Sequence, residues 1–539
     1  MDKDAVRSVL EHVAAFLALK GEQSPARIRA YQDAARAELA ATGRSTTLDE
    51  LREQVPPGLG EMLRIPGLGV AKVRQIHEQL HIESLADLED AALDGRLAAL
   101  PRFGPKAAGN VRKGIAALRE GSAFRLLHHA LDEAESITRG LAALEGVRRV
   151  AVAGSVRRRR EIIRDLDFVV VHAGSAGTRE ALLKRLDDAP GVIELAGKQG
   201  GLTLRFASGT VVDVFLTPEN EAGLALLRAT GSAEHLTQLD ARARARGVAL
   251  EPGGAWPDEE SVYRALGLPW IAPELREGMG EIDAAAEGRL PRLLEQRDLK
   301  GFVHCHTNYS DGTTTIAEWA AACRAASYEW MGITDHSESS AYAGGLRADH
   351  VERQHAEIDA ANRRHDDFRI LKGVEADILA DGSLDYGPAV LDRFDFVIAS
   401  IHTRFGMTEA EMTARVLRAL DDPHTTILGH PTGRLLLSRD PYAIDLQRVL
   451  ERAAQRGVAV EVNADPHRLD LDWRMVRRAR ELSVPISLGA DAHSVAGMSN
   501  VGVGVSIARK GWLGADDVLN TRDAAGFLAH ARRRRPVYA

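Results

Sequence analysis

The C-terminal half of the chain repeats one pattern of hydrophobic and polar positions. Short runs rich in Val, Ile and Leu each end in a residue whose side chain can bind a metal ion, and they read GFVHCH, GITDH, ILKGVE, FVIASIH, TILGH, VAVEVN and ISLGADAH. Runs of this length are typical of buried strands, and the intervals between them leave room for helices. The alternation predicts a barrel of strands and helices, in which the ends of the strands meet on one rim.

The residues at these strand ends predict a metal centre. They supply imidazole and carboxylate groups, which suit Zn²⁺, Mn²⁺ or Fe, and they exceed what one ion needs. Cys305 is the only nearby thiol, and strand alternation points it away from the two flanking imidazoles. A single histidine after a strand is more often structural, but seven such strand ends favour a site for two or three ions. Such sites activate water and clamp phosphoryl oxygens, so the pattern predicts phosphoester hydrolysis.

Longer motifs around these residues resemble the PHP (polymerase and histidinol phosphatase) domain from about residue 301 to 525. They are HCHTNYSDG, GITDHS, GVEADI, SIH, GHPTGRLL, VNADPHRLDL and GADAH. The resemblance implies a distorted seven-stranded barrel with three metal ions, in which Glu375 bridges two ions and takes part in catalysis. It implies that the metal ligands are His304, His306, Asp311, His336, Glu375, His402, His430, Asp491 and His493.

Two of the barrel's motifs are narrower. GHPTGRLL (429–436) and ARKGWL (508–513) are similar to the PHP domain that is fused to bacterial family X DNA polymerases. This resemblance narrows the expected substrate of the barrel to DNA.

The N-terminal region has apolar positions at helical spacing over residues 5–19 and continues in helix over 26–42. A Pro- and Gly-containing hairpin pattern then occurs twice, at 63–76 and 98–111, although Arg102 replaces the first glycine of the second copy. The pattern resembles the helix-hairpin-helix motif, whose backbone N–H groups bind phosphate without reading bases. The predicted DNA contacts are Gly67, Gly69, Lys72, Gly104 and Lys106.

The middle of the chain carries acidic residues on predicted strands. Asp165 and Asp167 alternate on one strand, so their carboxylates face one way, and Asp213 lies on a later strand that can pair alongside. Three carboxylates on one sheet face predict a site for two ions, Mg²⁺ or Mn²⁺. Upstream, Gly154-Ser155 together with Arg157 and Arg158 could hold a triphosphate.

This arrangement resembles the nucleotidyltransferase palm of family X DNA polymerases. The resemblance implies that Asp165, Asp167 and Asp213 are catalytic metal ligands, with Asp213 nearest the primer 3′ hydroxyl. It implies nucleotide contacts from Gly154, Ser155 and Arg158, and from Gly231 and Ser232 in the TGSAEH segment.

The predicted palm also departs from that family. One N-terminal helix-hairpin-helix is missing, so no deoxyribose-phosphate lyase is expected, and Arg164 replaces a glycine before the first catalytic Asp. Arg228-Ala229 replaces an aromatic pair, while Leu236 and Asp240 stand where the family has groups that contact the nucleotide and the template. Asp240 would repel the template backbone. These changes predict weakened templated synthesis.

Composition limits the setting of these sites. The 539 residues predict three or four domains, and two cysteines offer no disulfide framework. No long apolar run and a charged start predict a cytoplasmic protein without a membrane partner, and we expect a monomer. The net charge of −8 is unusual for a DNA-binding protein, and the basic stretches 157–160, 241–246 and 532–535 are expected to be solvated faces.

The fold class is therefore multidomain: an all-α helix-hairpin-helix domain (1–120), an α+β palm with a finger-like region (121–255), a connector (256–300) and a distorted (β/α)7 PHP barrel (301–539). The leading hypothesis is a DNA repair polymerase of family X that acts in base excision repair. The palm would fill gaps with dNTPs, and the barrel would act as a 3′-5′ exonuclease or phosphodiesterase on gapped or 3′-ended DNA. The alternatives are a nuclease whose polymerase half only holds DNA, a small-molecule phosphatase and a non-catalytic DNA-end scaffold.

Overall fold

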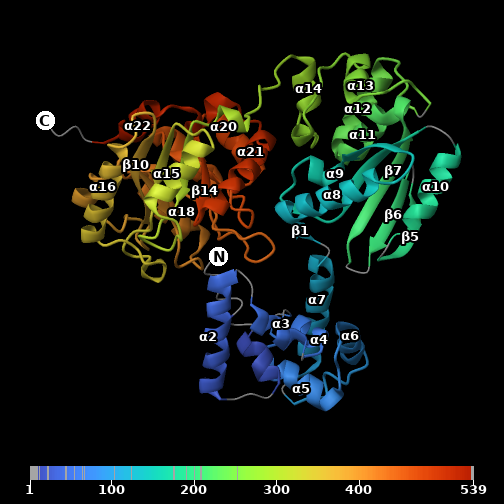
Figure 1. Cartoon of the computed structure of the whole chain (residues 1–539), viewed down its shortest axis with the longest axis horizontal. Coiled ribbons are helices and arrows are strands. Elements are labelled where there is room, and N and C mark those ends of the chain that lie inside the picture. The colour runs from blue at the N-terminus through green and yellow to red at the C-terminus, as the bar shows by residue number, and fades with distance from the viewer. Residues whose placement is uncertain are drawn as a thin grey trace. The chain divides into compact units, whose positions relative to one another are not determined.

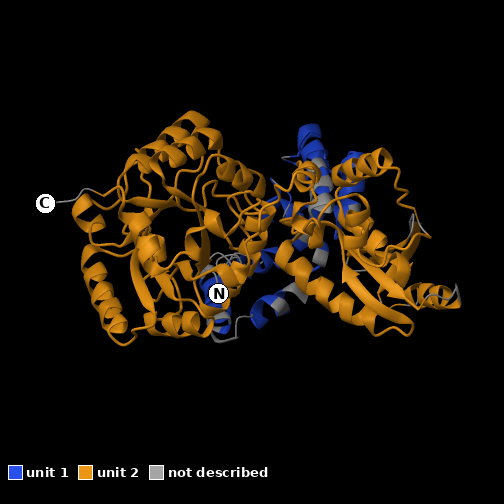
Figure 2. Ribbon diagram, turned by 90° about the horizontal axis from the view of Figure 1, so that it is seen from above, with its two compact units in different colours: residues 1–123 blue, residues 124–539 orange. Residues whose placement is uncertain are grey.

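The structure is a computed structural model of the chain (Figure 1), which divides into two compact units, residues 1–123 and residues 124–539 (Figure 2). It describes residues 10, 13–20, 24–42, 45–53, 55–63, 65, 67–101, 103–122, 124–173, 176–187, 189, 191–198, 201–206, 209–251 and 253–535.

Unit 1 is helical, as the N-terminal pattern predicts. Residues 13–19 are helical, whereas the rest of the predicted 5–19 helix, apart from Leu10, lies outside the described residues, as does Arg102. The core contains Met62, Val73 and Ile76, all without exposed surface. The helices that follow are α2 (Pro25–Thr42), α3 (Thr46–Glu53), α4 (Pro57–Met62), α5 (Val70–Leu80), α6 (Leu85–Leu93) and α7 (Pro105–Ser122).

Unit 2 begins with a five-stranded sheet in the order β2-β4-β7-β6-β5, in which only β4 and β7 pair in parallel. Its Val-rich central strands pack against α8, and Phe168 and Val214 are fully buried. A separate two-stranded sheet joins β1 to β3. We call residues 124–218 the palm region, and its elements are β1 (Arg125–Leu126), α8 (Leu127–Ala142), β2 (Val147–Val152), α9 (Gly154–Arg157), β3 (Ile162–Ile163), β4 (Leu166–His172), α10 (Ala176–Asp187), β5 (Val192–Lys198), β6 (Gly201–Phe206) and β7 (Val211–Pro218).

A helical segment follows the sheet and has a small core of its own, which includes Leu227, Tyr263 and Ile271. Trp512, from the far end of the chain, completes this core. The elements are η1 (Glu219–Glu221), α11 (Ala222–Thr230), α12 (Ala233–Ala245), α13 (Glu259–Ala265), η2 (Pro273–Leu275), α14 (Glu281–Ala286) and η3 (Gln296–Asp298).

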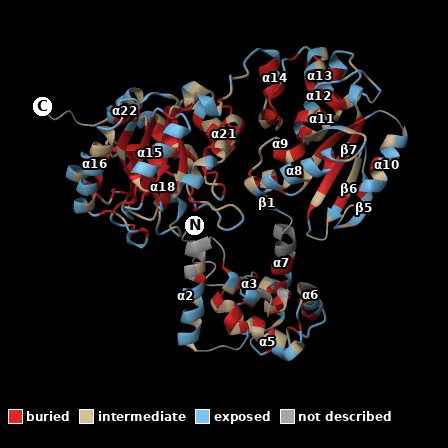
Figure 3. Cartoon of the chain, viewed as in Figure 1, coloured by how far each residue is buried: buried red, intermediate tan, exposed pale blue. Residues whose placement is uncertain are grey.

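The C-terminal part is a closed barrel of seven parallel strands in the order β10-β11-β12-β13-β14-β8-β9, which confirms the predicted barrel. The strands are β8 (Gly301–Cys305), β9 (Trp330–Ile333), β10 (Arg369–Asp377), β11 (Phe396–Ser400), β12 (Thr425–Leu428), β13 (Ala459–Asn463) and β14 (Ile486–Ala492). They are buried almost throughout (Figure 3). Phe527 packs with Trp330 and Phe396 inside, so one end of the barrel is filled by apolar side chains.

Helices cover the outside of the barrel. They are α15 (Ile316–Ala325), η4 (Ala341–Ala343), α16 (Ala348–Asn362), α17 (Pro388–Leu391), α18 (Glu409–Asp421), α19 (Leu446–Arg456), α20 (Trp473–Glu481), η5 (Val495–Asn500), α21 (Val501–Lys510), η6 (Ala515–Asp517), η7 (Leu519–Thr521) and α22 (Ala524–Arg532). Among the described residues, none of the helices combines the length and the apolar character needed to cross a lipid bilayer.

Candidate metal centre and nucleotide site

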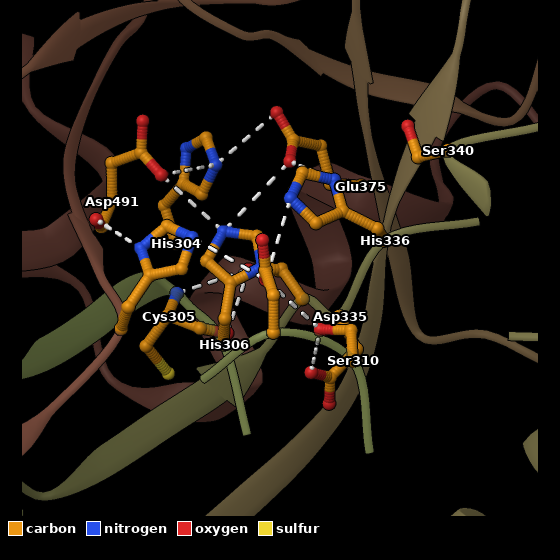
Figure 4. A network of polar contacts seen from close by, with 12 residues as sticks. His304, Cys305, His306, Ser310, Asp335, His336, Ser340, Glu375 and Asp491 are labelled. Carbon is orange, nitrogen blue, oxygen red and sulfur yellow. Dashed lines mark hydrogen bonds and ion pairs between the residues drawn. The ribbon is translucent and has the colours of Figure 1, made fainter. Parts of the chain in front are cut away.

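The strand ends of the barrel bring the predicted ligands together, as the alternating pattern requires. Figure 4 shows the side chains of His304, His306, His336, Glu375 and Asp491 converging on one space. Ligand atoms within 4.8 Å of one another form four overlapping groups: His306, Asp311, His336 and His493; His304, Glu375 and His430; His304, His306 and Asp491; and His336, Glu375 and His402. All nine predicted ligands belong to at least one group.

Glu375 occupies the middle of the cluster. Its Oε1 lies 2.9 Å from His430 Nε2, 3.3 Å from His304 Nε2 and 3.3 Å from His402 Nε2. Its Oε2 lies 3.0 Å from His336 Nδ1. Each carboxylate oxygen therefore faces a different set of imidazoles, which is the arrangement that a carboxylate bridging two ions needs.

Several buried polar atoms of the cluster lack a hydrogen-bond partner. His304 Nε2, both ring nitrogens of His306, His336 Nδ1 and Glu375 Oε2 are in this state. Burying such atoms without a partner costs about 1–3 kcal/mol each, and proteins rarely do so without a reason. Metal ions bound by these nitrogen and oxygen atoms would remove the cost, so the residues fit the predicted metal centre.

The pKa shifts of His306 and Glu375 suit metal binding. Burial lowers the pKa of His306 to about 3, and the charges of His493 and His336 act in the same direction, so the imidazole is neutral near pH 7. Burial alone raises the pKa of Glu375, but the surrounding histidines outweigh it and hold that pKa well below its usual range. Neutral imidazole and ionised carboxylate are the ligand forms.

A second layer of carboxylates orients the ligands. Glu461 makes a short hydrogen bond with His304 Nδ1 and accepts another from the His430 N–H at 2.7 Å. Asp377 makes a short hydrogen bond with His402 Nδ1. Such bonds fix which ring nitrogen faces the metal.

The sequence-based prediction did not include Glu461 and Asp377. Strand alternation in VEVN and VEAD could have identified both residues, because side chains two positions apart lie on the same face of a strand. Glu461 lies two residues before the strand-end Asn463, and Asp377 lies two residues after Glu375. Asn463 donates to Asp491 Oδ2 at 3.0 Å. Asp335, at a predicted strand end, accepts hydrogen bonds from Thr307 and Ser310 and so holds the loop that carries Asp311.

Strained backbone occurs at some of the ligands, among other positions. His304 has φ = 58° and Asp491 has φ = 49°, both in the left-handed region that favours glycine. The closed barrel holds these unfavourable conformations, which is typical of functional sites.

The palm carboxylates lie on neighbouring strands. Asp167 of β4 pairs directly with Asp213 of β7, and Asp213 accepts a hydrogen bond from Thr203 Oγ1 at 2.5 Å. Asp165 comes just before β4. In the part of the chain that the structure describes, these three carboxylates do not form a group of ligand atoms as tight as those of the barrel.

The turn at α9 packs against this pair of strands. Gly154 has φ = 58°, and an added Cβ would lie 1.7 Å from Asp167 Oδ2, so only glycine fits there. The hydroxyl of Ser155 is buried without a hydrogen-bond partner. A buried hydroxyl beside carboxylates fits the predicted contact with a nucleotide phosphate.

The Arg158 side chain makes hydrogen bonds to other residues of the protein. It donates to the Thr230 carbonyl at 2.6 Å and to Glu277 Oε1 at 3.0 Å. Arg157 pairs with Glu259, which also holds the fully buried Arg276. The expectation that residues 157–160 form a solvated face is therefore wrong for these two arginines, because buried acidic partners draw them inward.

Ser232 and Gly231 form the start of α12. Ser232 Oγ accepts from His235 N at 3.1 Å and caps the helix, while an added Cβ on Gly231 would lie 2.9 Å from Leu236. Their predicted contact with nucleotide stays a prediction.

Arg228 and Asp240, two of the residues that depart from the family pattern, form an ion pair with each other. Arg228 Nη2 lies 2.7 Å from Asp240 Oδ1, so the negative charge expected to repel the template has a cation beside it. The pair is about one-third exposed on each side, and its contribution to stability is small.

The hairpin glycines of unit 1 leave their backbone accessible. An added Cβ on Gly67, Gly69 or Gly104 would meet no atom within 4 Å. Lys72 Nζ donates to the Gly67 carbonyl at 2.9 Å, which braces the first turn. Lys106 is exposed in the first turn of α7. These positions could contact DNA phosphates.

Three family models match separate parts of the chain. The SAM-like helix-hairpin-helix tandem matches residues 59–117, the DNA polymerase beta thumb matches 225–277, and the PHP domain matches 303–465. We therefore call residues 225–277 the thumb. The matches confirm the predicted hairpins and PHP barrel, whereas the boundaries at 120, 255 and 300 stay predictions.

The chain is also similar to individual proteins. The DNA polymerase/3′-5′ exonuclease PolX of Bacillus subtilis (strain 168) is 34% identical over 570 residues, covering 98% of this chain and 99% of that protein. A probable phosphatase of Thermoanaerobacter sp. (strain X514) is 26% identical over 229 residues, covering 40% of this chain and 89% of that protein. A probable phosphatase of Vibrio parahaemolyticus serotype O3:K6 (strain RIMD 2210633) is 29% identical, with coverage of 40% and 88%.

Proposed function

Because this chain belongs to the family X DNA polymerase/3′-5′ exonucleases of the PolX type, we propose that it carries out both reactions with two separate sites. The barrel removes nucleotides from DNA 3′ ends, and the palm adds dNTPs to them in gapped DNA. The observation that carries the proposal is the complete set of nine ligands, Glu375 and the eight residues clustered with it, in a chain that also has the hairpins and the palm carboxylates.

In the barrel, Glu375 and the surrounding histidines would hold two or three ions, with Mn²⁺ or Zn²⁺ favoured over Fe. Bound ions would supply an activated water and charge to stabilise the phosphoryl oxygens. Glu461 and Asp377 keep His304 and His402 in the orientation and tautomer that binding needs.

In the palm, Asp165, Asp167 and Asp213 would hold Mg²⁺ or Mn²⁺, and the bound ions would supply the positive charge that in-line attack on a triphosphate needs. Gly154 permits the close approach of α9 to Asp167, and Ser155 and Arg158 would contact the phosphates. The reaction depends on positioning, so the replaced aromatic pair at Arg228-Ala229 predicts slower or less selective synthesis than the carboxylates alone would allow.

A phosphatase that acts on small molecules is the main rival, because probable phosphatases are among the proteins similar to this chain. Those matches cover only 40% of the chain, which also contains the hairpin tandem and the thumb. A DNA substrate accounts for these additional parts, whereas a small phosphate ester leaves them without a role.

Two matched double variants test whether the barrel degrades DNA and the palm extends it. Replacing His304 and His306 together by Ala should abolish degradation of a 3′-labelled primer with Mn²⁺ and leave extension intact. Replacing Asp165 and Asp167 together by Ala should abolish extension and leave degradation intact. Unchanged degradation in the first variant or unchanged extension in the second would refute the assignment of that site.

A further inference from the structure

Lys510 is a buried cation at the end of barrel helix α21. Its side chain has no exposed surface. Its ammonium donates to the Arg158 carbonyl at 2.9 Å, the Glu274 carbonyl at 3.3 Å and Glu277 Oε1 at 2.5 Å. All three acceptors belong to the palm region or the thumb, so this barrel residue uses its three donors outside the barrel.

The acceptors connect Lys510 to the nucleotide-binding turn. Glu277 pairs with Lys510 and Arg158, and Arg160 Nη1 lies 3.6 Å from its Oε2. Arg158 comes directly after α9 and also donates to the Thr230 carbonyl, just before Gly231. Glu277 therefore joins the barrel to Arg158, and Arg158 in turn contacts the second segment that is predicted to line the nucleotide.

We propose that Lys510 is a positioning residue for nucleotidyl transfer, supplied to the palm by the barrel. The inference rests on the proposed role of Arg158 as a ligand of the incoming triphosphate. Glu277 and the Thr230 carbonyl take the Nε and Nη1 donors of Arg158, so a triphosphate that binds this guanidinium competes with Glu277 for it. Lys510 neutralises Glu277 and holds the Arg158 backbone, which lowers the cost of releasing the Arg158 side chain.

The physical argument concerns a buried carboxylate and the cations around it. With Lys510 present, Glu277 keeps a full counter-charge after Arg158 departs. Without Lys510, only the more exposed Arg160 would remain, at 3.6 Å. A buried charge left without a close partner is costly, so Glu277 would retain Arg158 and the triphosphate would bind more weakly.

The neighbouring Arg509 provides a matched control. It carries the same charge on the same helix, and its Nε lies 2.7 Å from Glu274 Oε1 across the same contact. It also donates to the Leu294 carbonyl at 3.0 Å, but it has no hydrogen bond to Arg158 or Glu277 among those of the described residues. A variant of Arg509 therefore weakens the contact between the barrel and the thumb without changing the partners of Glu277.

The experiment measures single-nucleotide gap filling by the full chain, with kcat and the KM for dNTP determined at saturating DNA. Lys510→Met should raise that KM about tenfold, with kcat and exonuclease activity within about twofold of the unmodified chain. Arg509→Met should leave the KM unchanged. The double variant K510M/E277Q should restore the KM to within about threefold, because the competing carboxylate charge is gone.

The possible results either support or overturn the role proposed for Lys510. An unchanged KM in K510M, or a double variant as impaired as K510M, would overturn the role of Lys510 while gap filling by the unmodified chain still supports the proposed function. No gap filling by the unmodified chain would overturn both. If K510M does not fold, Glu277→Gln alone should lower the KM about threefold, and an unchanged or higher KM would refute the proposal.

Discussion

The barrel centre and the palm site differ in which parts of the fold hold their carboxylates. The barrel ligands come from strand ends and the loops that follow them, are buried or half-buried, and form clusters that only the closed fold assembles. The palm carboxylates share two neighbouring strands, and the groups around them come from turns, the thumb and the barrel. A barrel ligand therefore depends on the whole barrel, whereas the surroundings of the palm can change residue by residue.

The departures illustrate this difference. Arg228 and Asp240 depart from the family together and form an ion pair with each other. The nine barrel positions show no comparable replacement. The barrel is the more constrained site because several ligands share Glu375, so the loss of one ligand affects more than one ion.

The largest expected effect is at the palm turn. Gly154→Ala would force a side chain onto Asp167 at a left-handed φ of 58°, so extension in a gapped duplex should fall about a thousandfold. Exonuclease activity should not change. Gly197→Ala is the control, because a Cβ there meets nothing within 4 Å. Normal extension by the Gly154 variant would show that α9 does not need to approach Asp167.

The contact between palm and thumb should depend on pH. Burial raises the pKa of Glu259, but hydrogen bonds from Arg157 and Arg276 outweigh it and lower that pKa from 4.5 to about 2. A lowered carboxyl pKa stabilises the fold above pH 4.5, and the contribution, about 3 kcal/mol, is lost as pH falls from 4.5 to 2.

Trp270 can report this loss, because its Nε1 donates to Glu259 Oε2 at 3.1 Å. The urea midpoint followed by Trp270 fluorescence, with Trp270→Phe as the blank, should fall across that pH range. Glu259→Gln should lower the midpoint at pH 7 and remove most of the dependence. An equal pH dependence in the Gln variant would assign it to other groups.

The barrel's second layer should have an intermediate effect. Glu461→Gln replaces the carboxylate that orients His304 and should weaken Mn²⁺ binding about 10- to 100-fold, with exonuclease activity falling in parallel. Titration with Mn²⁺ measures the Kd, and Glu481→Gln on exposed α20 is the control. Full affinity in the Glu461 variant would mean that the barrel holds His304 without this bond.

The smallest expected effect is at the Arg228–Asp240 pair. Asp240→Asn removes one acidic charge and releases Arg228, so affinity for gapped DNA should rise about threefold, with a steeper dependence on salt. Fluorescence anisotropy at two salt concentrations measures both quantities. A loss of affinity would indicate that the pair orders α12 and does more than offset a charge.

Much of the barrel centre could be predicted because parallel strands place their ends on one rim, whatever the loop lengths. The strand-end pattern gave His304, His336, Glu375 and Asp491 without knowledge of distances. Glu461 and Asp377 were missed because a carboxylate that orients a ligand looks, in sequence, like any polar residue near a strand end.

The contacts of the palm were less predictable. The run 157–160 reads as a basic surface, yet its first two arginines point to Glu259 and Glu277, about a hundred residues away. In the sequence, ARKGWL is a motif that resembles family X polymerases and says nothing about contacts. In the structure, its Lys510 and Trp512 contact the thumb. Side-chain direction at such positions is set by distant partners.

The sequence by itself determined the elements, the seven-stranded barrel and the chemical types of both sites, because periodicity and ligand type are local properties of the chain. Only the tertiary structure decided that Glu375 faces five histidines, that Glu461 and Asp377 stand behind the ligands, and that Lys510 reaches the turn at Arg158. The physical reason is that burial and distances of a few ångströms set these interactions, and both arise when residues far apart in the chain are packed together.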